Sequence, residues 1–396
     1  MFKPTLIAID YETALTSGEP SIEFYRDDFR VVCTAFAWRS EDGSIKKKFC
    51  NGEDETREFL KQCEGIPLVV HNMCFESGVS MYRFPELDLN FKYDTMRLAQ
   101  LADGGGSEQD RFNKKTDIDS MMRELQGEEV ETYGLSLEKC GYRWLPSEYQ
   151  GHKQEAHEYL RGLGVKKGHE GANLHLLPHD VMVRYNEADA EVTLVLCETL
   201  LAFFKKIRFD PHFDHALYMK KCKFISSARG KGVKVKREPL RNYHEELEQR
   251  KLDIAEEVRK IHPKEVAQLE LKVLSDMVGS LKSKKGQHNK FLQLQESGDY
   301  KFKVGSAKQK EYLFIKLLGM KTPFRTPKDK ISFKKTHLEP FGEAGKVLKD
   351  LGGIKITSKQ AESILIMSEY DGRVHLSLNP TATKSGRSGG GIATGD

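Results

Sequence analysis

Short apolar runs and amphipathic segments follow one another through the first half of the chain. Uninterrupted apolar runs predict buried strands, and apolar positions at helical spacing predict helices. The segments predicted as strands are 5–10, 31–38, 45–50, 66–72 and 91–95. The segments predicted as helices are 54–63 and 74–84. Strands that first succeed one another and then alternate with helices are typical of an α/β sheet covered by helices.

The pattern becomes helical after residue 102. A polar, glycine-rich stretch over 103–117 is followed by helical segments near 117–127, 134–141 and 152–162. A long helix is predicted over 178–208 because Val181, Tyr185, Ala188, Val192 and Leu196 recur at its period. The segment 209–214 resembles a hinge, and 237–262 predicts a long charged helix. We therefore expect two domains, 1–208 and 209–396.

Charge divides the chain in the same way. The net charge is +4, but residues 1–200 carry 23 Lys and Arg against 36 Asp and Glu, whereas residues 201–396 carry 40 against 23. An asymmetry of this size indicates separate modules, and the basic one suits a polyanion as partner.

Other features of the composition exclude several classes of protein. No apolar run reaches the roughly 18 residues of a membrane span, and the first residues lack the pattern of a signal peptide. Seven scattered cysteines without a CxxC pair argue against a zinc site or a disulfide framework. We therefore expect a cytoplasmic location.

Acidic residues follow or lie near several of the predicted core elements. Asp10 and Glu12 end the first strand and share one side of it, so they need a cation, a shared proton or an exit to solvent. Glu76 lies in the first helical turn after the strand 66–72. Tyr185 and Asp189 are four residues apart and share a helix face. Each of these features is ordinary by itself.

Their order resembles that of the DEDD family of 3′–5′ exonucleases, in the subgroup whose third motif contains a tyrosine. The resemblance covers residues 1–208 and implies an RNase H-like sheet. It places Asn72 and Phe75 beside Glu76 in the second motif, as residues that touch nucleic acid; the family usually has aspartate at the position of Glu76. Asp94, in a YDTM segment, is interpreted as a helix cap.

The resemblance also implies how the acidic residues work. Two Mg²⁺ or Mn²⁺ ions would stabilise the charge that develops during phosphodiester hydrolysis. Asp10 would bridge them, Glu12 and Asp189 would complete one site, and Glu76 would hold the other. Tyr185 would position the attacking water.

The second half resembles the polymerase region of family A DNA polymerases, those related to bacterial DNA polymerase I. The segments that carry this resemblance are 225–240, 304–332 and 371–391. It implies a thumb and partial palm, with Arg387 near the primer 3′ end and Thr383 and Lys384 near phosphates. Further phosphate contacts are expected from the lysine cluster 281–290, around Ser283, Lys284 and Lys285.

The rest of the palm and the fingers have no counterpart after Arg387. The resemblance therefore implies no polymerase activity for this chain alone. It implies the first part of a split polymerase, as in some bacteriophages, or of a truncated one. A second polypeptide carrying the palm and fingers is the expected partner, besides DNA.

The prediction is a metal-dependent 3′–5′ DNA exonuclease that proofreads during DNA replication. Two alternatives stay open. The first is a stand-alone exonuclease in repair, which would be a stable monomer. The second is a DNA-binding or assembly subunit with a weak or inactive site, which would bind DNA without metal-dependent turnover.

Overall fold

The chain forms two compact units. The computed structural model describes residues 4–17, 21–103, 134–151, 153–167, 170–280, 284–326, 329–380 and 389–391 of the 396-residue sequence. Unit 1 comprises Met1–Val233 and His375–Gly395, and unit 2 comprises Lys234–Val374. The chain passes between them through β6 (Val233–Lys234) and β7 (Arg373–Val374), which pair with each other.

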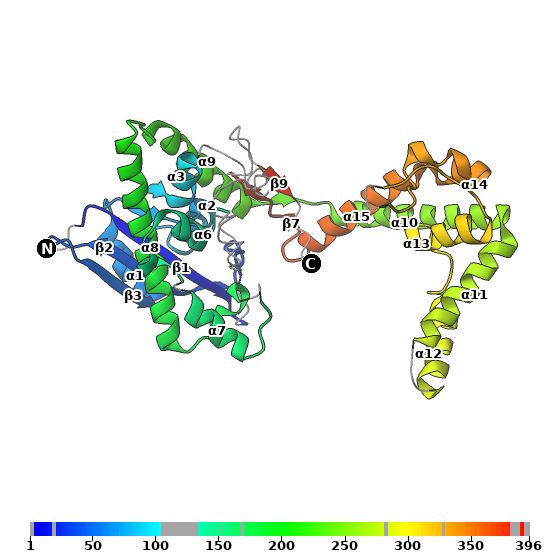
Figure 1. The fold of residues 1–396 in the computed structure, drawn as a ribbon. Helices are drawn as coiled ribbons and strands as arrows, with labels where there is room; N and C mark the ends of the chain where they lie inside the picture. The colour runs from blue at the N-terminus through cyan, green and yellow to red at the C-terminus, as the bar shows by residue number, and fades with distance from the viewer. Residues whose placement is uncertain are drawn as a thin grey trace. The chain divides into compact units, whose positions relative to one another are not determined.

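Unit 1 is built on a mixed five-stranded sheet in the order β3-β2-β1-β4-β5 (Figure 1). Its strands are β1 (Ile7–Leu15), β2 (Phe29–Arg39), β3 (Ile45–Asn51), β4 (Leu68–Val70) and β5 (Phe91–Asp94). The central strand β1 is antiparallel to β2 and parallel to β4. All five predicted strands are present, and the predicted α/β class with a mixed sheet is confirmed.

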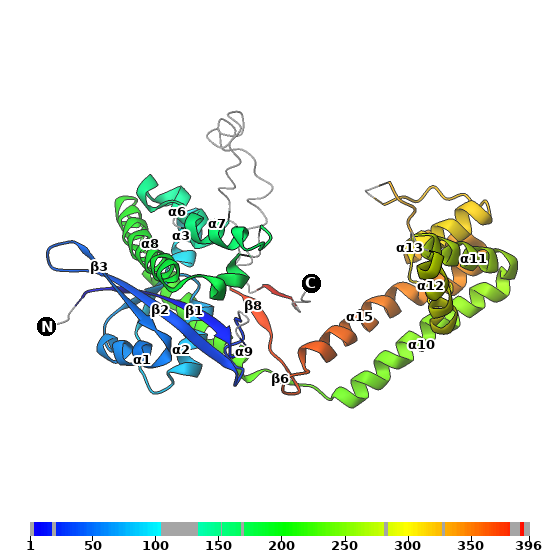
Figure 2. The ribbon, with the colours of Figure 1, turned by 90° about the horizontal axis from the view of Figure 1, so that it is seen from below.

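Helices cover both faces of this sheet (Figures 1 and 2). They are α1 (Gly52–Cys63), α2 (Met73–Arg83), α3 (Thr95–Ala102), α6 (Leu137–Trp144), α7 (Gln154–Gly162), α8 (His179–Lys206) and α9 (His212–Lys231). Alternation along β1 divides the core: Ile7 and Ile9 pack with residues of α1, α2 and α9, whereas Ala8 packs with residues of α3, α6 and α8. Asp10 and Glu12 follow the parity of Ala8, so they lie on the face that α8 covers.

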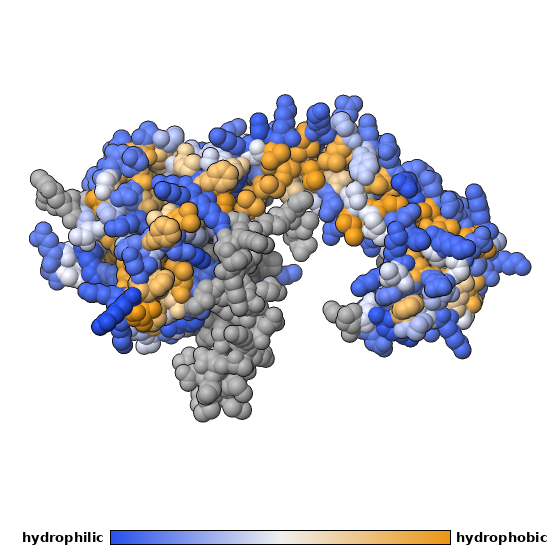
Figure 3. Space-filling model, turned by 90° about the horizontal axis from the view of Figure 1, so that it is seen from above, coloured by the Kyte–Doolittle hydropathy of each residue, from blue (hydrophilic) through white to orange (hydrophobic). Residues whose placement is uncertain are grey.

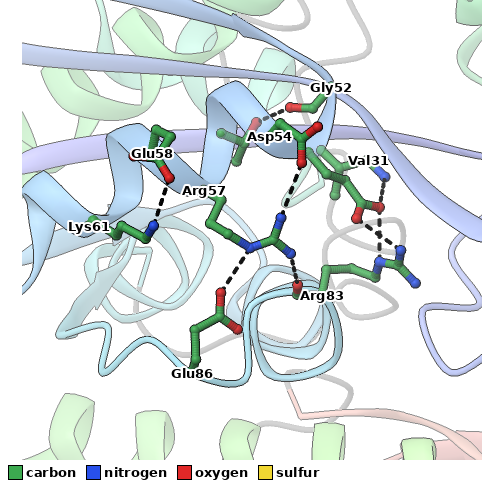
Figure 4. A network of polar contacts seen from close by, with 10 residues as sticks. Val31, Gly52, Asp54, Arg57, Glu58, Lys61, Arg83 and Glu86 are labelled. Carbon is green, nitrogen blue, oxygen red and sulfur yellow. Dashed lines mark hydrogen bonds and ion pairs between the residues drawn. The ribbon is translucent and has the colours of Figure 1, made fainter.

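A network of ion pairs ties α1 to the end of α2 (Figure 4). Glu53 of α1 accepts the backbone N–H of Val31 at 3.1 Å and pairs with Arg83 of α2 at 2.9 Å. Arg57 of α1 pairs with Glu86 at 2.9 Å and donates to the Arg83 carbonyl oxygen at 3.0 Å. Cross-linked charges of this kind fix the direction of α2, which carries Glu76.

Helix α9 belongs to unit 1, although the sequence placed a hinge and a domain boundary just before it. Its residues Tyr218, Met219 and Cys222 are buried in the same core as α2. The two helices approach so closely that a Cβ at Gly230 would lie 1.7 Å from the Tyr82 hydroxyl. The boundary between the compact units lies after Val233, whereas the predicted domains divide after Arg208.

Unit 2 is mostly helical. Its helices are α10 (Arg237–Ile261), α11 (Pro263–Gly279), α12 (Lys284–Ser297), α13 (Ala307–Glu311), α14 (Gly342–Val347) and α15 (Leu351–Met367). Helices α10 and α15 lie side by side (Figure 2), and Phe314 and Phe341 are fully buried in the core of the unit. Helix α10 confirms the long charged helix predicted over 237–262.

The remaining elements are short. They are the 3₁₀ turns Ser147–Tyr149, Gly171–Leu176, Lys335–His337, Glu339–Phe341 and Leu348–Asp350, the π-helical turn Tyr312–Leu317, and strands β8 (Ser377–Asn379) and β9 (Gly389–Gly391). The helix predicted over 117–127 lies outside the described residues.

The surface is polar with apolar patches between the charged side chains (Figure 3). On α9, Phe213, Leu217 and Phe224 are all exposed. Among the described residues, no helix combines the length and the apolar character needed to cross a membrane.

Candidate active site

Three carboxylates converge at the end of β1. Asp10 and Glu12 come from β1, and Asp189 comes from α8, which crosses that face of the sheet. Each offers an oxygen, and the three oxygens all lie within 4.8 Å of one another. Asp189 is buried, and Asp10 and Glu12 are half-buried. The structure thus brings together three of the four residues for which a metal-binding role was predicted.

Burial and mutual repulsion dominate the electrostatics of this group. Burial and then the Asp189 charge raise the pKa of Asp10 from 3.8 to about 8. Burial and then the charges of Asp10 and Asp189 raise the pKa of Glu12 well above its usual value. Asp10 and Glu12 therefore resist ionising together next to the Asp189 charge. A divalent cation would reverse that tendency, and hard cations prefer carboxylate oxygens.

Glu76 lies next to the three carboxylates without joining their group. It sits in the first turn of α2, is only 3% exposed and accepts a backbone hydrogen bond from Tyr11. Burial and then the charges of Asp10 and Glu12 raise its pKa. Its Oε2 atom is buried without a hydrogen-bond partner. A buried carboxylate oxygen without a hydrogen-bond partner, on a residue that feels the charges of other acids, is a further observation that fits a cation ligand.

Helix α8 also supplies Tyr185 and Asn186, one turn before Asp189. Tyr185 is buried at the predicted position, and burial and then the Asp189 charge raise its pKa. Asn186 is fully buried and donates from Nδ2 to Asp10 Oδ2 at 2.7 Å. The amide therefore orients the Asp10 carboxylate. Sequence reasoning missed Asn186 because asparagine next to a motif residue carries no distinctive spacing.

A lysine that the sequence did not single out enters the acidic group. Lys153 directly precedes α7, and its Nζ donates to Asp189 Oδ2 at 2.9 Å and to the Tyr185 hydroxyl at 3.0 Å. Burial alone would lower the pKa of Lys153. The Asp189 charge and then Tyr185 raise this pKa by more than burial lowers it, so the net pKa lies above the usual value. Lys153 is thus a charged ammonium group inside the site. Only the fold brings it there, 36 residues before Asp189 in the chain.

The second-motif segment is held by Asp94. Asn72 has a left-handed backbone with φ of 81°, and the backbone N–H groups of Asn72 and Met73 donate to Asp94 at 3.1 and 2.9 Å. Asp94 also accepts from the N–H of Met96, so it caps α3 as the sequence predicted. Phe75 packs half-buried against the core of unit 1. Contacts of Asn72 or Phe75 with nucleic acid stay predictions.

Most of the other predicted DNA-binding positions lie outside the described residues. These are Ser283, Thr383, Lys384 and Arg387. Lys284 and Lys285 begin α12, but the structure describes only their backbone. Their roles remain predictions from the sequence.

Comparisons with known proteins give a likeness of fold. No protein-family model matches the chain, and no curated protein matches its sequence. Its fold is similar to a solved structure described as the POL domain of Pol1 from M. smegmatis in complex with DNA primer-template and dNTP, with a TM-score of 0.55 and 14% identity. The match covers 98% of this chain and 52% of that one, so the chain spans about half the length of that polymerase domain.

Proposed function

We propose that this protein is a divalent-metal-dependent 3′–5′ DNA exonuclease attached to part of a family A-type DNA polymerase, acting in DNA replication. The observation that carries the proposal is the convergence of Asp10, Glu12 and Asp189 within 4.8 Å. Glu76, with its orphaned oxygen, lies beside them. The fold likeness to a polymerase domain solved with primer-template DNA supports DNA as the partner.

The donor set fits Mg²⁺ or Mn²⁺ because it consists of oxygen ligands. Asp10, Glu12 and Asp189 would hold one ion, and Glu76 with Asp10 would hold a second. When bound, such ions stabilise the negative charge that develops on the attacking and leaving oxygens of a phosphodiester.

The chain's own residues would then align the reactants. In hydrolysis, a water oxygen bonds to the terminal phosphorus and the 3′ oxygen of the preceding nucleotide leaves with a proton, releasing a 5′-mononucleotide. Tyr185 keeps its phenolic proton because its pKa is raised, so its hydroxyl can hold the water by a hydrogen bond but does not act as the base. Asn186 fixes the orientation of Asp10 through its hydrogen bond.

The test is digestion of a 3′-mismatched primer–template with Mg²⁺. Asp10→Ala and Asp189→Ala should abolish stepwise 3′ shortening, because each removes a carboxylate from the central group. Asp180→Ala is the matched control: Asp180 lies on the same helix, but its carboxylate is 71% exposed and pairs with Arg184. Equal or absent cleavage in all variants would reject this site and favour a DNA-binding or assembly subunit.

We also propose a second polypeptide that carries the remaining palm and fingers. The proposal rests on the resemblance of segments 225–240, 304–332 and 371–391 to the polymerase region of family A DNA polymerases. Size analysis and pulldown from native lysate should reveal a complex in which primer extension appears. A stable monomer with full exonuclease activity and no such partner would favour the stand-alone enzyme.

A further inference from the structure

Lys153 occupies the candidate metal site with a charge of its own. Its side chain is 18% exposed and that of Asp189 is 4% exposed, so the pair is largely removed from water. The ammonium group also lies 5.0 Å from the centre of the Tyr185 ring. A cation is therefore bound to two of the residues assigned to metal binding and water positioning.

The influence of this charge extends beyond its two direct partners. The Lys153 charge favours the ionised forms of Asp10 and Glu12 as well as that of Asp189. Lys153 thus acts as a counter-ion for the whole group of three carboxylates. Such a group would otherwise meet the cost of burying like charges together.

A divalent ion at the same carboxylates would be repelled by the ammonium group. Asp189 Oδ2 lies 2.9 Å from Nζ, so an ion bound to Asp189 would lie only about 5 Å from Nζ if the lysine stayed in place. Even in water, charges of +2 and +1 at that separation repel strongly enough to weaken binding about tenfold. The flexible four-carbon stem of lysine allows the head group to move away.

We propose that Lys153 competes with the divalent ion for Asp189. Without metal, Lys153 is the resident counter-cation that keeps the site folded; when the ion binds, Asp189 exchanges the ammonium group for it. This inference rests on the metal site of the proposed function, and it assigns Lys153 as a positioning residue that sets metal affinity.

The experiment is titration of the full chain with Mn²⁺ alone, with free Mn²⁺ followed by electron paramagnetic resonance. Lys153→Met should bind Mn²⁺ about tenfold more tightly than wild type, as the repulsion above implies. Lys153→Arg keeps the charge and should resemble wild type. Lys47→Met is the matched control, because Lys47 of β3 pairs at 2.9 Å with Glu191 of α8, and neither residue belongs to the group of three carboxylates.

A second neutral variant guards against misfolding. Lys153→Gln keeps hydrogen-bond donors for Asp189 and Tyr185 but carries no charge, so it should also bind Mn²⁺ more tightly. Folded neutral variants with unchanged or weaker Mn²⁺ affinity would overturn the inference. If wild type bound no Mn²⁺, or Asp10→Ala left exonuclease activity intact, the metal site itself would be rejected. Mn²⁺ binding and a normal exonuclease, without tighter binding in the neutral variants, would reject only the role of Lys153.

Discussion

Replacing Asp10 by asparagine should stabilise the metal-free protein at alkaline pH. In the folded state the pKa of Asp10 lies at about 8, above its usual 3.8. The folded protein therefore binds this proton more tightly than the unfolded chain does. The stabilisation that results is complete below pH 4, and it is lost as the pH rises from about 4 to about 8.

The size of the effect follows from the same values. At about 1.4 kcal/mol for each tenfold change in proton affinity, ionising Asp10 at pH 8 costs up to about 5 kcal/mol of folding free energy. Removing the Asp10 charge also weakens the repulsion that acts on Glu12 and Asp189. We therefore expect the folding free energy of Asp10→Asn to exceed that of wild type by about 2–5 kcal/mol at pH 8 in EDTA. At pH 4 the gain should nearly vanish. Asparagine keeps an oxygen to accept the Asn186 hydrogen bond.

Intrinsic fluorescence offers a local assay. Both tryptophans of the chain, Trp38 and Trp144, belong to unit 1, so urea unfolding followed by their emission reports on the unit that contains the site. With Mg²⁺ added, wild type should gain stability through ligand binding, and Asp10→Asn should gain much less. Asp180→Asn serves as control. Equal stabilities of wild type and Asp10→Asn at pH 8 in EDTA, or equal responses to Mg²⁺, would refute the electrostatic reasoning.

Three further outcomes are expected. Asp94→Ala should destabilise unit 1 by about 3–5 kcal/mol in urea unfolding, because the carboxylate accepts hydrogen bonds from several buried donors. A loss below about 1 kcal/mol would show that water takes the place of the missing carboxylate. Gly78→Ala should lower the melting temperature, since its Cβ would lie 2.2 Å from the Phe24 ring, whereas Gly162→Ala, where nothing lies within 4 Å, should not. Binding of a primer–template, measured by fluorescence anisotropy in EDTA, should weaken at least tenfold between 50 and 200 mM salt if the basic half contacts phosphates; a flat salt response would argue against such contacts.

Elements with a strong local pattern were predictable from the sequence. The apolar run of β1 and the periodic face of α8 define a strand and a long helix, and these two elements carry Asp10 and Asp189. Once one face of a strand is buried, the alternation of side chains decides which face of the sheet each residue occupies. The parity of Asp10 and Glu12 was therefore predictable before the sheet order was known.

Residues brought in by tertiary packing were not predictable. Lys153 lies just before a short helix, with no neighbouring motif, and only the packing of α7 near α8 places its ammonium group against Asp189. The division of the compact units after Val233 was not predictable for a similar reason. Asp210 and Pro211 have the composition of a linker, but the helix that follows them is buried on one face against α2.

The two crossings at β6 and β7 make unit 2 an insertion within unit 1. His375 returns to stack on Tyr25 with ring centroids 3.5 Å apart, and Lys221 donates to the Pro380 carbonyl oxygen at 3.3 Å. The two ends of the inserted segment are held together by pairing of the two strands. If the residues between β6 and β7 were removed and the two strands joined by a short turn, closing that turn would cost unit 1 little conformational entropy. A gene truncated after Val233, by contrast, would leave Tyr25 without its stacking partner, so the separable form of unit 1 is a spliced chain rather than a shortened one.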